Sequence, residues 1–213
     1  MIFKIRLHQP RVSVPGILLV AATLTLVSAC AGQTPVLNSE RIAQRFGSYG
    51  VDVLTQRGDL RVTSLFSGSG SNKTTRTLAI VRFQGAAVGA LANAHREILA
   101  GSSLGATLKA HGFAVAKFTL DIDTFEPTAL SGRYSELMRL SAPTSLAMHA
   151  YRLRAQRTDE SSVPYATIIE LHHPDYLTHA ELESIFGGQP AEAPMQGEIA
   201  QLLIAGGERA NLW

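Results

Sequence analysis

Cysteine is nearly absent from this chain: Cys30 is the only one in 213 residues. A single thiol excludes an intramolecular disulfide and any metal site built from two or more thiolates. Its position is also distinctive, because it follows an apolar run, in the segment LTLVSACAG at residues 24–32. We therefore expect Cys30 to have one dedicated role outside the folded core.

The chain also lacks a strong excess of positively or negatively charged residues. The chain has 19 Lys and Arg residues against 17 Asp and Glu residues, a formal charge of +2. Three of the basic residues, Lys4, Arg6 and Arg11, lie in the first 29 residues, and without that segment the formal charge becomes −1. Proteins that bind nucleic acids need clustered positive charge to neutralise phosphates. The charge balance therefore gives no support to a nucleic-acid partner.

Acidic residues are missing before Glu40, and the apolar run in that region is too short to span a bilayer. Pro15-Gly16 interrupts the run near its start, so only residues 17–27 are continuous, whereas a membrane helix needs about 20 residues. A basic start, a short apolar stretch and small residues before a break are typical of an export signal. The sequence therefore predicts that residues 1–29 are a signal peptide.

The end of this run has a more specific pattern. Val27-Ser28-Ala29-Cys30 resembles the lipobox of bacterial lipoproteins, with an aliphatic residue, two small residues and then the cysteine. The resemblance covers residues 1–30, and it implies cleavage between Ala29 and Cys30 and a diacylglyceryl group on the Cys30 sulfur. The alternative is a secreted protein with an unmodified cysteine at its cleavage site.

The lipobox resemblance also implies a location. Lipoproteins carry two or three acyl chains on one residue, and each buried methylene contributes about 0.8 kcal/mol to membrane binding. An aspartate after the cysteine retains such proteins at the inner membrane in enteric-type bacteria, but Ala31 stands here. The resemblance therefore implies the outer membrane, with the folded domain facing the periplasm.

Composition divides the rest of the chain into three parts. Residues 30–38 form a tether, in which the eight residues after Cys30 reach at most about 28 Å when extended. Residues 39–187 have a length typical of one globular domain. Residues 188–213 contain a linker with glycine and proline, followed by a tail in which a terminal helix is expected.

Hydrophobic periodicity predicts an α+β domain, with helices packed on one mainly antiparallel sheet. Helices are expected at 38–46, 86–100, 102–108 and 178–187, with a helical turn near 134–140. Strands are expected at 49–56, 59–66, 74–83, 113–122, 145–155 and 164–172. Residues Thr178 and Glu181 have the spacing of a capping box. Within the strand at 113–122, alternation predicts one shared interior face for Ala116, Phe118, Leu120 and Ile122.

The densest group of possible metal ligands lies in the hairpin formed by the last two strands. If the hairpin turns about residues 159–160, His149 lies opposite Glu170, and His172 shares the same face of the sheet. Two histidines and a carboxylate suit zinc or copper. The preferred interpretation is an exposed, metal-free ion pair of His149 and Glu170, which predicts a raised histidine pKa. His173 points to the opposite face because neighbouring strand residues alternate.

A second pattern concerns Ser103. The segment Gly101-Ser102-Ser103-Leu104-Gly105 matches the nucleophile-elbow pattern, which requires a strand before the serine and a helix after it. The residues before Ser103 have helical periodicity, so a tight connection between two helices is the preferred interpretation.

These observations predict a lipid-anchored cell-envelope protein with a binding or structural role. We expect no catalytic residue and no cofactor, and the expected partners are the membrane, through Cys30, and an envelope protein or small ligand. The alternative is an envelope enzyme or metal-binding protein that uses His149, Glu170 and His172, or Ser103 as a nucleophile.

Overall fold

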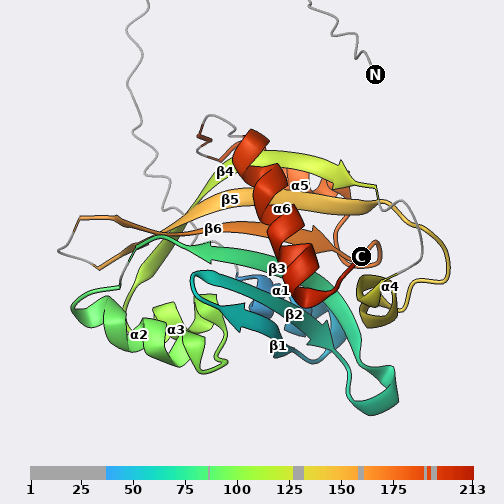
Figure 1. The fold of residues 1–213 in the computed structure, drawn as a ribbon, viewed down its shortest axis with the longest axis horizontal. Helices are drawn as coiled ribbons and strands as arrows, with labels where there is room; N and C mark the ends of the chain where they lie inside the picture. Colours follow the sequence, from blue (N-terminus) through green and yellow to red (C-terminus); the bar gives the residue numbers. More distant parts are fainter. Residues whose placement is uncertain (1–36, 86, 127–131, 158–160, 190, 193–195) are drawn as a thin grey trace, which may run out of the picture. The chain divides into compact units, whose positions relative to one another are not determined.

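The computed structural model describes residues 37–85, 87–126, 132–157, 161–189, 191–192 and 196–213. The predicted signal peptide, the lipidated Cys30 and nearly all of the tether lie outside these ranges. The described residues form six α-helices packed on one six-stranded sheet, in which every neighbouring pair of strands is antiparallel (Figure 1). The predicted α+β fold class is therefore confirmed.

The sheet joins two three-stranded meanders, because β3 pairs with β6 to give the order β1-β2-β3-β6-β5-β4. All six predicted strands are present, with ends within three residues of the prediction. Their bounds are β1 (Gly50–Arg57), β2 (Leu60–Ser67), β3 (Thr74–Phe83), β4 (Ala114–Phe125), β5 (Leu146–Gln156) and β6 (Val163–His172).

Helices cover both faces of the sheet (Figure 1). One face carries α4 (Arg133–Met138) and α6 (Gln196–Ala210), which pack on apolar residues such as Leu78, Ala150 and Leu171. The opposite face carries α1 (Asn38–Phe46), α2 (Ala90–Leu99), α3 (Leu104–Ala110) and α5 (His179–Phe186). Here the core is divided into an apolar cluster under α2 and α3 and another under α1 and α5. Three buried polar residues, Arg61, Thr63 and Glu170, also lie on this face and line one cavity.

The C-terminal helix is part of the core. Ile199 and Leu202 of α6, and Leu212 after it, are buried in the same cluster as residues of the strands. A Cβ on Gly206 would lie 2.5 Å from Cγ2 of Ile80, so glycine allows α6 to lie directly on β3. The compact unit that contains the sheet continues to Trp213, and the folded domain therefore extends beyond residue 187. No helix in the described ranges combines the length and hydropathy required to cross a membrane.

Strand β4 differs from its predicted pattern. Its pairing with β5 shifts register between Thr119 and Asp121. Leu120 is buried in the cluster under α4 and α6, whereas Ile122 packs against the cluster under α1 and α5. A bulge adds one residue and reverses the alternation after it. The prediction of one shared interior face is therefore wrong for Ala116, Phe118, Leu120 and Ile122.

The predicted capping box at the start of α5 is confirmed. Thr178 Oγ1 accepts a hydrogen bond from the main-chain N–H of Glu181 at 3.3 Å, and the Glu181 carboxylate accepts one from the N–H of Thr178 at 2.7 Å. Thr178→Ala removes the first bond and should lower the free energy of unfolding by about 0.5–2 kcal/mol. Urea denaturation checks this, with Glu183→Gln, an exposed change in the same helix, as the control. Equal midpoints for the two variants would contradict the prediction.

Candidate functional site

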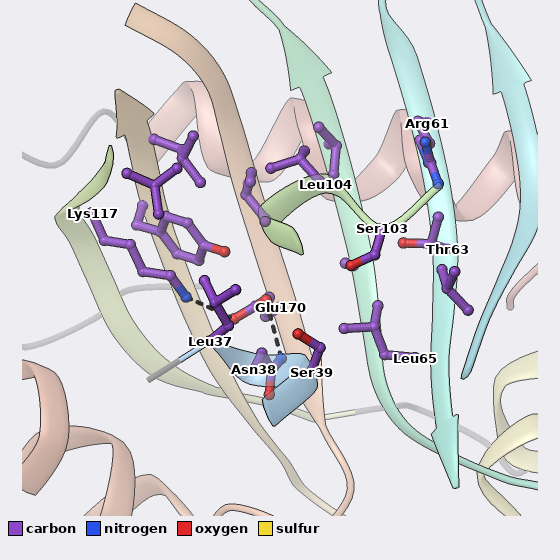
Figure 2. A pocket seen from close by; sticks show the side chains of 18 of the residues that line it. Leu37, Asn38, Ser39, Arg61, Thr63, Leu65, Ser103, Leu104, Lys117 and Glu170 are labelled. Carbon is purple, nitrogen blue, oxygen red and sulfur yellow. Dashed lines mark hydrogen bonds and ion pairs between the residues drawn. The ribbon is translucent and has the colours of Figure 1, made fainter. Parts of the chain in front are cut away.

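A cavity of about 80 Å³ lies on the face of the sheet that is covered by α1 and α3. Residues of both apolar clusters of that face border it, and the first residues of α1 and α3 form its rim (Figure 2). Its floor consists mainly of apolar side chains from the strands, among them Leu65, Ala79, Val81, Leu153 and Ile168.

A buried ion pair occupies one side of the cavity (Figure 2). Glu170 on β6 lies with Oε2 3.6 Å from Nζ of Lys117 on β4, and the two side chains are only 7% and 14% exposed. Asn38, at the start of α1, donates a hydrogen bond to Oε1 of Glu170 at 3.2 Å. The Lys117 ammonium also lies 4.1 Å from the ring centroid of Tyr151. Each charge is thus compensated in spite of its burial.

The ion pair sets the protonation states of both groups. Burial raises the pKa of Glu170, but the surrounding basic side chains, Lys117 first among them, and the hydrogen bond from Asn38 together outweigh burial and lower the pKa to about 2. Burial lowers the pKa of Lys117, and the Glu170 carboxylate opposes that shift. The carboxylate is therefore ionised near neutral pH, with Lys117 as its ionic partner.

The predicted register of the hairpin is confirmed, since His149 lies opposite Glu170 and His172 shares their face of the sheet. The two side chains do not form the predicted exposed pair, however. His149 is fully buried, its Nε2 lies 3.2 Å from Oγ1 of Thr119, and its ring stacks on Phe186 with centroids 4.2 Å apart. Instead, the histidine nearest to the carboxylate is His172, with Nε2 3.8 Å from Oε2 of Glu170.

The prediction of a raised histidine pKa is wrong, because both rings are buried. Burial, with the charge of Lys117, lowers the pKa of His149 to about 3. Burial also lowers the pKa of His172 to about 4, although Glu170 opposes that shift. Both histidines are therefore neutral at pH 7, and the ionic partner of Glu170 is a lysine that lies two strands away.

The predicted metal ligands come together on one face but do not make a metal site. In the part of the chain that the structure describes, no group of three or more His, Cys, Asp or Glu side chains is arranged to hold a metal ion. His172 Nδ1 lies within 3.0 Å of the hydroxyl of Thr77, and Glu170 is engaged by Lys117 and Asn38. The geometry therefore gives the metal alternative with His149, Glu170 and His172 no support.

Ser103 lies on the rim of the cavity, at the residue before α3. The element before it is helix α2 rather than a strand, so the context of a nucleophile elbow is missing. Its hydroxyl is 3.0 Å from the hydroxyl of Tyr49, and the described residues that line the cavity include no histidine. In the part of the chain that the structure describes, the side chain hydrogen-bonded to Ser103 is thus a tyrosine, and no histidine or carboxylate stands beside it as a serine nucleophile requires.

Sequence reasoning missed two charged residues at this site, Lys117 and Arg61. Arg61 lies on β2, lines the cavity and is only 2% exposed. Its guanidinium donates hydrogen bonds to the main-chain carbonyls of Ile98 and Ser102, the latter at 2.9 Å, and it contacts no carboxylate in the described ranges. Its position between Leu60 and Val62 could have indicated its burial. Alternation places Arg61 on the opposite face of the sheet from these two residues, and a helix that covers that face buries the arginine.

The cavity thus combines an apolar floor, a compensated ion pair and an arginine without an acidic partner. A concave, largely apolar surface with a few buried polar groups is typical of a site for a small molecule. No protein-family model matches this chain, and no curated protein matches it.

Proposed function

We propose that this chain is a lipid-anchored cell-envelope protein whose α+β domain binds a small ligand in the cavity between α1 and α3. The observation that carries the proposal is the position of three buried charged side chains, Arg61, Lys117 and Glu170, around one open space. Burying a charge costs free energy. A domain with a purely structural role has no need of this arrangement, whereas a ligand site uses it to orient and select what it binds.

The sequence supports the anchored location. The basic start, the short apolar run and the lipobox-like Val27-Ser28-Ala29-Cys30 agree with one another. The proposed partner of the N-terminus is the outer membrane, on its periplasmic face, through acyl chains on Cys30. The short tether would keep the ligand-binding domain close to the lipid surface.

The anchor makes a direct prediction. Cys30→Ser should abolish lipidation, because a hydroxyl is a much weaker nucleophile than a thiolate for the transfer of a diacylglyceryl group. The protein should then accumulate as an uncleaved precursor. Mass spectrometry of the N-terminus checks this in the wild type and the variant. A wild-type N-terminus that is not a diacylglyceryl-modified Cys30 would contradict the proposal.

Filling the cavity should abolish binding. Ala79 lies on the floor and is 5% exposed, so Ala79→Leu places three further carbon atoms in the space that a ligand would occupy. We expect thermal melting with a panel of small carboxylates, amides, amines and alcohols to show stabilisation of the wild type, and loss of it in Ala79→Leu. Ala116→Leu on exposed β4 surface is the matched control and should keep the response. If every member of the panel acts equally on wild type and Ala79→Leu, the proposed site is wrong.

A further inference from the structure

We propose that the ligand is a short-chain monocarboxylate, with its carboxylate beside Arg61 and its hydrocarbon part over the apolar floor. This inference rests on the proposed ligand-binding function and adds the chemical class of the ligand. It is carried by the charges around the cavity, the donors beside Arg61 and the size of the space.

The charges around the cavity favour one negative charge on the ligand. In the described residues, the Lys, Arg, Asp and Glu side chains that line it are Arg61, Lys117 and Glu170. Lys117 and Glu170 compensate each other at 3.6 Å. Among the described residues, the hydrogen-bond partners of the Arg61 guanidinium are two main-chain carbonyls, those of Ile98 and Ser102, and it forms no ion pair there. One buried positive charge thus lacks a counter-ion, and a monoanion would supply it.

The two sides of the cavity differ in a way that orients the ligand. Figure 2 shows Arg61, Thr63 and Ser103 on one side, and Lys117 and Glu170 on the other. Because Tyr49 can donate to the oxygen of Ser103, the Ser103 hydroxyl can donate its own hydrogen into the cavity. An arginine beside two hydroxyls forms strong, charge-assisted hydrogen bonds with a carboxylate. The Glu170 carboxylate repels an anion from the other side.

The size and polarity of the space limit the rest of the ligand. The volume of about 80 Å³ exceeds the roughly 10–15 Å³ that one water molecule requires, so the space suits a small molecule rather than a single water. A ligand of a few non-hydrogen atoms, such as acetate or propionate, would fit there, and longer chains would extend through the opening. Val81, Leu153 and Ile168 on the floor suit a hydrocarbon part better than a second charged group.

Calorimetric titration of the purified, detergent-solubilised protein tests this inference. Its probes are sodium propionate, the neutral isostere propionamide and inorganic phosphate. We expect propionate to bind about tenfold or more tightly than propionamide, since only propionate carries the charge that Arg61 recognises. Arg61→Gln should remove that preference, and Arg57→Gln, which changes an exposed arginine on β1, should keep it.

The outcomes separate this inference from the function on which it rests. Equal binding of propionate and propionamide would overturn the carboxylate assignment and leave a small-ligand site in place. Tighter binding of phosphate than of propionate would also overturn it. An absence of binding by these probes, together with no response to the wider panel, would overturn both proposals. The comparison of propionate with propionamide needs only wild-type protein, so it decides the matter even if Arg61→Gln does not fold.

Discussion

Replacing Glu170 by leucine should lower the free energy of unfolding by about 3–5 kcal/mol, because it leaves Lys117 buried without a counter-ion. Lys117 is only 14% exposed, and Glu170 is its one acidic partner within 4.0 Å in the described residues. Its other close neighbour at this point is the ring of Tyr151, which offers far less compensation than a carboxylate.

The double variant Lys117→Met with Glu170→Leu provides the decisive comparison. We expect it to recover most of the loss, since apolar side chains of similar size often replace a buried ion pair at little cost. Asp59→Asn breaks an exposed pair with Arg82 and serves as the control, at about 1 kcal/mol or less. Urea denaturation gives all the free energies. A loss for Glu170→Leu no larger than that for Asp59→Asn would show that water compensates Lys117.

Acid should destabilise the protein well above the pH at which carboxylates titrate. The folded pKa values of His149 and His172, about 3 and about 4, lie below the unfolded value of about 6.5. Below pH 6.5 the unfolded chain binds protons that the folded chain does not, so stability is present above that value and is lost as pH falls. Between pH 7.5 and pH 5 each histidine should account for about 2 kcal/mol.

The expected total is therefore about 4 kcal/mol for these two histidines. Burial also lowers the pKa values of His95 and His173. These two residues therefore add to the loss of stability as the pH falls. Urea denaturation at the two pH values measures the total. His149→Gln and His172→Gln should each reduce the pH dependence by about 2 kcal/mol, whatever they do to stability at pH 7.5. Equal wild-type stability at pH 5 and pH 7.5 would contradict the burial of both rings.

A chelator distinguishes this effect from metal binding, because the stability of a metal site also rises with pH as its ligands lose protons. We expect a chelator at pH 7.5 to leave the melting temperature unchanged. If the chelator lowers the melting temperature of the wild type but not that of His149→Ala, a metal site that includes His149 would be supported instead.

The sequence by itself determined the local features of this fold. The strands agree within three residues, because their apolar alternation and the intervening glycines act over a few residues. The capping box of Thr178 and Glu181 is local for the same reason. The pairing of His149 with Glu170 also followed from the sequence, since a short hairpin loop sets the register of its two strands.

Only the tertiary structure determined which residues come together at the candidate ligand site. Arg61, Lys117 and Glu170 come from β2, β4 and β6, and they surround one cavity only because α1 and α3 cover the same face of the sheet. The bulge after Thr119, which sequence alternation did not predict, also changes which residues of β4 share a face. Burial then reverses the expected direction of the His149 pKa shift. These properties depend on which elements exclude water from a side chain, and that depends on contacts between residues far apart in the chain.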